Sequence, residues 1–141
     1  PTGVQLPESF PRIGMRFVLD KACEQAVWYG RGPLETYPDC KEGNAIGCWK
    51  KNVEDFYFPY VLPQETGNHE DTRWAAFVTE AGNGICIASD KEFSFGALHY
   101  TQEDLTQATH TNELHKTENI QLSVDYAQNG LAERAEQYRR K

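Results

Sequence analysis

Strict alternation of apolar and polar side chains is the feature that most constrains the fold of this chain. Every second side chain is apolar in the run Ile120-Gln-Leu-Ser-Val-Asp-Tyr126, as in a β-strand that buries one face. Residues 13–19 alternate in the same way. Shorter strand-like runs occupy residues 26–29, 73–79, 84–89 and 93–98. The pattern predicts an all-β protein.

Two local signals mark a hairpin and a single internal helix. Gly82-Asn-Gly84 predicts a tight turn between two of the strands. Thr101 is placed to cap a helix over residues 100–108, with Asp104 in the position of the capping-box acid.

Three other segments give weaker patterns. Residues 41–54 have no clean period, which predicts irregular structure. Pro59 makes residues 57–61 either an extended edge or the entry to a loop. Residues 132–141 hold helix formers but little apolar surface, so we expect a frayed helix or a packing contact there.

The segment from Trp28 to Asp39 concentrates aromatic rings, glycines, prolines and charges. Its glycines allow backbone angles that other residues avoid and its prolines fix φ, so we expect a loop with a defined path. A sugar stacks its C–H face on an aromatic ring while its hydroxyls bond to carboxylates and guanidinium groups. The candidate carbohydrate-binding residues are therefore Trp28, Tyr29, Arg31, Glu35 and Asp39. An ordinary well-packed turn between β-strands has the same composition.

Length and charge limit the class of protein. The 141 residues suffice for one domain. A net charge of −7, without a basic stripe interleaved with aromatics, argues against a nucleic-acid partner. No apolar run approaches the roughly 20 residues of a membrane helix, and no signal segment is visible. We therefore expect a soluble protein, and the sequence does not indicate whether it is cytoplasmic or periplasmic.

Neither the cysteines nor the histidines predict a disulfide framework or a metal site. Cys23 and Cys86 lie in strand-like runs and are interpreted as reduced, apolar fillers, whereas pairing of Cys40 with Cys48 stays open. No set of cysteines and histidines has zinc-ligand spacing. Surface or hydrogen-bonded structural roles are favoured for the four histidines, which are His69, His99, His110 and His115.

Charged side chains in the loops allow two roles. Retaining glycosidases need two carboxyl groups about 5 Å apart, and nothing in the sequence shows that two of its many carboxylates converge. Arg31 and Arg73 are candidate clamps on Glu35 or Glu65, a structural role as well supported as ligand contact.

The loop at residues 28–39 is accompanied by four further blocks in a fixed order and spacing. These are Pro11-Arg-Ile-Gly-Met-Arg-Phe17, Phe58-Pro-Tyr-Val-Leu-Pro-Gln-Glu-Thr-Gly67, Thr72-Arg-Trp74 and Phe93-Ser-Phe-Gly-Ala-Leu-His-Tyr-Thr-Gln-Glu-Asp-Leu105. Together they resemble the C-terminal, small-chain domain (domain 5) of the β-galactosidases of glycoside hydrolase family 2. The resemblance runs from residue 11 to residue 131. We therefore predict a partial small-chain domain over residues 1–131 and an atypical tail over residues 132–141.

The resemblance implies an antiparallel β-sandwich, the supersandwich, which is similar to the galactose mutarotase fold. The family's catalytic carboxylates and its magnesium and sodium sites lie in a barrel that this chain lacks, so the resemblance implies no catalytic residue, metal or cofactor here. In some members the domain lends an aromatic side chain to the active-site wall. No matching aromatic stands between Trp74 and Phe93, so that role is not carried over.

The function implied is that of a non-catalytic fragment of a retaining β-galactosidase, whose parent hydrolyses terminal β-D-galactosides such as lactose. Its role would be that of a scaffold and a subunit contact, and its loops could lie at the edge of the active site. Its partner would be the remainder of the β-galactosidase chain or a large subunit. Missing strands would expose sheet edges and apolar faces, so we expect self-association or marginal stability.

Two alternatives remain open from the same residues. One is a galactoside-binding module that uses the 28–39 loop. The other is a mutarotase-like enzyme, in which His99 would be the acid and Glu65 or Glu35 the base.

Overall fold

The computed structural model describes residues 12–128, which form one antiparallel sheet of six strands. The strands are β1 (Arg12–Leu19), β2 (Gln25–Gly32), β3 (Ala45–Asn52), β4 (Asn68–Val78), β5 (Gly84–Leu98) and β6 (Ile120–Gln128). The short helices are η1 (Val53–Phe56), α1 (Gln102–Gln107) and η2 (Thr111–Glu113). The order across the sheet is β1-β6-β5-β4-β2-β3. No helix in this part of the chain is long and apolar enough to cross a membrane.

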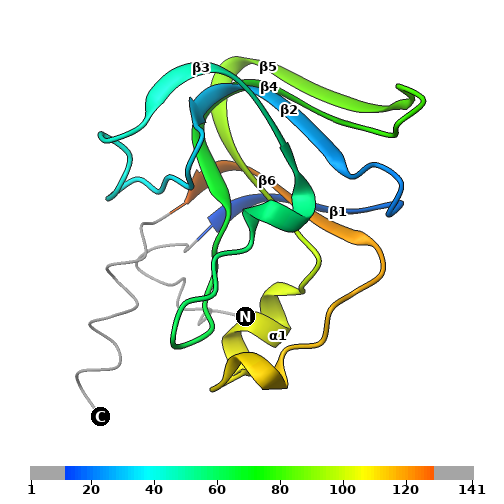
Figure 1. Ribbon diagram of the computed structural model, residues 1–141. Coiled ribbons are helices and arrows are strands. Elements are labelled where there is room, and N and C mark those ends of the chain that lie inside the picture. Colours follow the sequence, from blue (N-terminus) through cyan, green and yellow to red (C-terminus); the bar gives the residue numbers. More distant parts are fainter. Residues whose placement is uncertain (1–11, 129–141) are drawn as a thin grey trace, which may run out of the picture.

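The long strand β5 belongs to both halves of the sheet. Its residues 84–88 and 93–96 pair with β4 on one side, and its residues 94–98 pair with β6 on the other. Shifts of register between β4 and β5 add local twist. Figure 1 shows β1 and β6 lying below the part of the sheet that β2, β3 and β4 form, with α1 lower still. The sheet therefore curls.

The curled sheet places its core between its two halves. Trp28 of β2 and Phe95 of β5 have ring centroids 5.8 Å apart, although β4 lies between their strands. β6 adds its alternate apolar side chains from below. Phe56 of η1 and Leu105 of α1 complete the same cluster from outside the sheet.

The all-β antiparallel class predicted from the sequence is confirmed. The curled arrangement is consistent with a β-sandwich, although all six strands of the described residues belong to one continuous sheet. Every predicted strand is present, and the runs at 84–89 and 93–98 are parts of β5. The hairpin turn contains Gly82 at φ +83°, a left-handed angle that suits glycine.

The predicted helix is present, with one difference at its cap. The Thr101 hydroxyl accepts a hydrogen bond from the Asp104 backbone N–H at 3.1 Å. The Asp104 carboxylate does not complete the box, because it accepts the backbone N–H of His115 at 2.6 Å instead.

The prediction of irregular structure over residues 41–54 was wrong. Residues 45–52 form β3, which pairs with β2 along its whole length. Residues 57–61 lie outside any strand, as the proline predicted. The prediction for residues 132–141 lies outside the described residues.

All four cysteines are free, which includes Cys40 and Cys48, whose pairing the sequence left open. Cys23 is partly buried against the core. The filler role was wrong for Cys86, which is exposed because its neighbours Ile85 and Ile87 take the inward positions of β5.

Candidate functional site

Residues 30–32, which were expected in the loop, extend β2, so the loop begins at Pro33. Its path is defined, as predicted. A cis peptide bond joins Gly32 to Pro33. Thr36 then ties the loop to β4, because its backbone N–H donates to the Asn68 carbonyl at 2.7 Å. Its hydroxyl accepts the Glu70 backbone N–H at 2.8 Å, and its carbonyl accepts the Asn68 amide at 2.7 Å.

Trp28 lies in the core and not on the surface. Its side chain is 0% exposed and contacts the rings of Phe56, His69 and Phe95. Its indole N–H donates to the Arg31 carbonyl at 3.0 Å. The expected role as a sugar platform is therefore wrong for this residue, because neither face of its ring is available.

Glu35 braces the loop internally. It accepts hydrogen bonds from the hydroxyl of Tyr60, from Thr66 Oγ1 at 2.7 Å and from the Gly67 backbone N–H at 2.7 Å. Burial and the neighbouring carboxylate raise the pKa of Tyr60, so the phenol stays protonated and donates. Both carboxylate oxygens of Glu35 thus hold residues 60–67 against the 28–39 loop.

Arg31 forms a second brace. Its Nε donates to Asp71 at 2.5 Å, and its Nη1 donates to the carbonyls of Lys41 and Asn44, each at 3.0 Å. The Lys41 ammonium also binds Asp71, at 2.8 Å. Although burial raises the pKa of Asp71, the hydrogen bonds from both cations hold it below its usual value.

The structural role predicted for the two arginines is present, but their partners differ from those predicted. Arg31 binds Asp71 rather than Glu35 or Glu65, and Arg73 binds Glu92 at 2.6 Å. Asp71 is one of the candidate carboxylates in the sequence, but sequence reasoning did not pair it with Arg31, which lies 40 residues away. In the structure Asp71 lies at a shift of the β4–β5 register and has a left-handed φ of +52°, neither of which the sequence shows.

The two remaining candidate sugar residues face solvent. Tyr29 is 37% exposed on the outer face of β2, where Trp74 of β4 is its cross-strand neighbour. Asp39 is exposed in the loop. The five candidates are therefore not gathered in one cavity: one lies in the core, two brace loops and two face outward.

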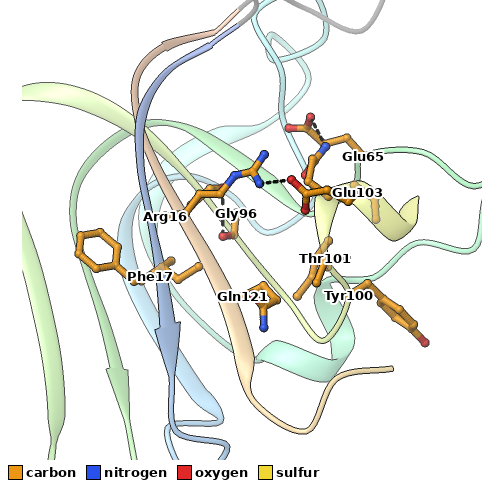
Figure 2. A pocket seen from close by; sticks show the side chains of 13 residues that line it. Arg16, Phe17, Glu65, Gly96, Tyr100, Thr101, Glu103 and Gln121 are labelled. Atoms are coloured by element: carbon orange, nitrogen blue, oxygen red, sulfur yellow. Dashed lines mark hydrogen bonds and ion pairs between the residues drawn. The ribbon is translucent and has the colours of Figure 1, made fainter. Parts of the chain in front are cut away.

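A small pocket lies elsewhere, between β5, β6 and β1 on one side and the start of α1 on the other (Figure 2). Arg16 and Glu103 form an ion pair at its edge, 2.5 Å apart. Glu65 contacts Arg12 and accepts the Gln102 amide at 2.8 Å. The pocket has a volume of about 50 Å³, enough for a few water molecules, whereas pockets that bind drug-sized ligands measure roughly 300–1,000 Å³.

Two buried titratable groups lie in the sheet. His69 is 1% exposed among aromatic rings, and neither ring nitrogen has a hydrogen-bond partner. Burial and the nearby Lys51 charge lower its pKa to about 3, so the imidazole is neutral. Asp125 is equally buried; its Oδ2 lies 3.2 Å from Arg12 Nε without hydrogen-bond geometry. Burial raises the pKa of Asp125 to about 6.

His99 does not have the partner that a mutarotase reading required. Its Nε2 lies 3.0 Å from Glu24, whereas Glu65 and Glu35 are held by the other groups described above. The predicted acid–base pairs were therefore wrong. The surface role expected for His110 and His115 is confirmed, because both are exposed.

Comparison with known proteins decides the family. A family model described as β-galactosidase small chain matches residues 2–138. The chain belongs to the β-galactosidase small-chain family.

Curated relatives place this small-chain segment within much longer proteins. The β-galactosidase of Priestia megaterium is 36% identical over 126 residues, which cover 89% of this chain but 12% of that protein. The β-galactosidase BgaC of Bifidobacterium adolescentis is 36% identical over 126 residues, covering 87% and 12%. The β-galactosidase of Kluyveromyces lactis is 35% identical over 135 residues, covering 95% and 13%. The chain thus spans about 12% of the length of the relatives it matches.

Proposed function

We propose that this chain is a non-catalytic part of a retaining β-galactosidase, in which it serves as scaffold and as a contact for the rest of the protein. The parent would hydrolyse terminal β-D-galactosides such as lactose. The observation that carries the proposal is that charged side chains of the 28–39 segment are engaged in bracing it, Glu35 through three donors and Arg31 through Asp71.

The engagement of the carboxylates supports a non-catalytic role. Retaining hydrolysis needs two carboxyl groups about 5 Å apart and free to act on a sugar. Glu35, Glu65 and Asp71 each bind donors of their own chain. The pocket beside α1 is also far smaller than a cavity for a disaccharide.

An apolar rim on the braced loops supports a contact role. Val61 is 99% exposed, and large apolar side chains beside it and in the neighbouring loop are more than half exposed, namely Leu34, Phe58 and Leu62. The Glu35 brace holds these loops together. Apolar side chains fixed in water are typical of a surface that another part of the protein covers, and the partner we propose is the remainder of the β-galactosidase.

Segment exchange in a relative tests the proposal. The matching 126-residue segment of the Priestia megaterium β-galactosidase would be replaced by this chain, with the intact enzyme and a deletion of the segment as references. We expect the isolated chain not to hydrolyse a chromogenic β-galactoside, the deletion to be inactive or insoluble, and the exchange to restore folding and hydrolysis.

Two variants make this exchange specific. In the restored protein, Val61→Asp should lower activity or assembly, because it places a charge in the proposed contact. Asn112→Asp, which adds the same charge at an exposed position of η2, is the matched control and should not. Hydrolysis by the isolated chain, or a deletion as active as the intact enzyme, would contradict the proposal.

A galactoside-binding role is a second candidate, favoured by the outward Tyr29 beside Trp74. A galactose titration followed by amide NMR should then shift signals around Tyr29, and Tyr29→Ala should remove the shifts while Trp28→Phe retains them. No response at millimolar galactose would leave only the scaffold role.

A further inference from the structure

Two glutamates and a histidine converge at the end of β5, away from the 28–39 loop. Glu24 precedes β2, Glu54 lies in η1 and His99 follows β5. One ligand atom from each lies within 4.8 Å of the other two, and this is the only such group of three among residues 12–128. We propose that Glu24, Glu54 and His99 form a binding site for a divalent transition-metal ion of the zinc class.

The backbone fixes the elements that carry these three side chains. The Val53 N–H donates to the Glu24 carbonyl at 2.9 Å, and the Glu54 N–H donates to Glu24 Oε1 at 2.7 Å. On the other side, the Thr117 N–H donates to the His99 carbonyl at 2.7 Å. These bonds join the start of β2 to η1 and anchor His99, so the site does not depend on side-chain contacts alone.

The hydrogen-bond acceptors around His99 favour a proton or a metal ion at its Nε2 atom. Its Nδ1 lies 3.3 Å from the Thr117 carbonyl and its Nε2 lies 3.0 Å from Glu24 Oε2, and both oxygens only accept. A neutral imidazole donates from one nitrogen, so its other nitrogen would point a lone pair at an acceptor. Either a proton or a metal ion resolves this conflict. Metal-bound histidines usually donate their second N–H to a carbonyl or carboxylate, and the Thr117 carbonyl beside Nδ1 is placed to accept such a bond.

The ligand types and spacing fit a zinc-like ion. Zinc binds imidazole nitrogen and carboxylate oxygen at about 2.0–2.2 Å, so tetrahedral ligand atoms lie about 3.3 Å apart. The Nε2–Oε2 separation already matches. Glu54, whose side chain is 56% exposed, is free to close the remaining distance. Two carboxylates, a neutral imidazole and a divalent ion sum to zero charge, and water would complete the coordination.

Lys116 is the built-in competitor for this site. Its ammonium contacts Glu54 and its side chain is 50% exposed, so it can swing away. Metal binding would replace one cation with another at the same carboxylate. Removing Lys116 should therefore tighten metal binding. If Glu54 and Lys116 formed only a structural ion pair, removing Lys116 would not change the affinity for metal.

Metal titration of the full chain tests the site. After chelator treatment, ZnCl₂ is titrated by calorimetry, and the melting temperature is measured with and without Zn²⁺. We expect one equivalent to bind and raise the melting temperature. Glu54→Gln should weaken binding at least about tenfold, as should His99→Gln if it folds, and Lys116→Met should strengthen it.

Two controls separate this site from others. His115→Gln removes another histidine that lies beside a carboxylate, 3.1 Å from Asp104, and should leave Zn²⁺ affinity unchanged. The Co²⁺ form should lack the intense sulfur-to-metal absorption of a cysteine ligand. Strong absorption of that kind, equal binding by Glu54→Gln, or no effect of Zn²⁺ on the wild-type chain would overturn the proposal.

Discussion

The neutral imidazole of His69 makes a specific prediction about acid stability. In the folded chain its pKa is about 3, whereas an exposed histidine has a pKa near 6.5. Below pH 6.5 the unfolded chain therefore binds a proton that the folded chain does not. Stability that is complete above pH 6.5 is lost as the pH falls toward 3. Between pH 7 and pH 5 this loss is about 2 kcal/mol.

Asp125 acts in the opposite direction over the same range. Its folded pKa is about 6 against an ordinary 3.8, so the folded chain takes up the proton first and gains stability as the pH falls from 6 to 3.8. The gain by pH 5 is about 1 kcal/mol. The wild-type chain should lose less than about 1 kcal/mol from pH 7 to pH 5, His69→Leu should gain about 1, and Asp125→Asn should lose about 2.

Urea unfolding at pH 7, 6 and 5, followed by tryptophan fluorescence, measures these differences. Leucine is close to histidine in volume and removes two buried nitrogens that have no partners. Phe77→Leu, which replaces a buried ring of the same core that does not titrate, is the matched control and should keep the wild-type pH dependence. If His69→Leu lost as much stability as the wild type between pH 7 and pH 5, the reasoning would be refuted.

Three further predictions concern the braced loop and its strand. Glu35→Gln should destabilise the chain by about 1–3 kcal/mol in urea unfolding, because its three donors lose a charged acceptor; an unchanged midpoint would show that the brace is not needed. Trp28→Ala should cost about 3–5 kcal/mol, because a fully buried ring is removed, and a smaller loss would mean that the core collapses around the cavity. Gly30→Ala puts a Cβ 2.8 Å from Thr72 Cα and should lower the melting temperature, whereas Gly43→Ala meets nothing within 4 Å and should not; equal shifts would contradict this steric argument.

The strands that the sequence predicted are those whose inward positions carry apolar side chains. β3 was not predicted because its inward positions are not all apolar. Lys51 pairs with the buried Ala26 and so takes an inward position, where its ammonium lies 5.6 Å from the centroid of the Phe56 ring. A lysine at an inward position hides the two-residue period. Pairing with β2 then overrides the weak local pattern.

The candidate site was predictable in its rigidity but not in its contacts. Glycines and prolines indicated that the 28–39 loop is fixed. Whether a ring in a strand faces the core or water depends on a shift of one residue, and Trp28 and Tyr29 fall on opposite sides. The braces join Arg31 to Asp71 and Glu35 to Gly67, across 40 and 32 residues, and one sequence carries no record of such pairings.

The pairing of β1 with β6 has a consequence for biosynthesis. These two strands lie about 100 residues apart in the sequence, yet they are hydrogen-bonded neighbours in the sheet. At translation rates of about 5–20 residues per second, β1 leaves the ribosome roughly 5–20 s before its partner exists. During that interval its exposed side chains, among them Met15 and Val18, have no strand to join. The nascent chain must therefore remain unaggregated, alone or held by a chaperone, until almost the whole described sequence has been made.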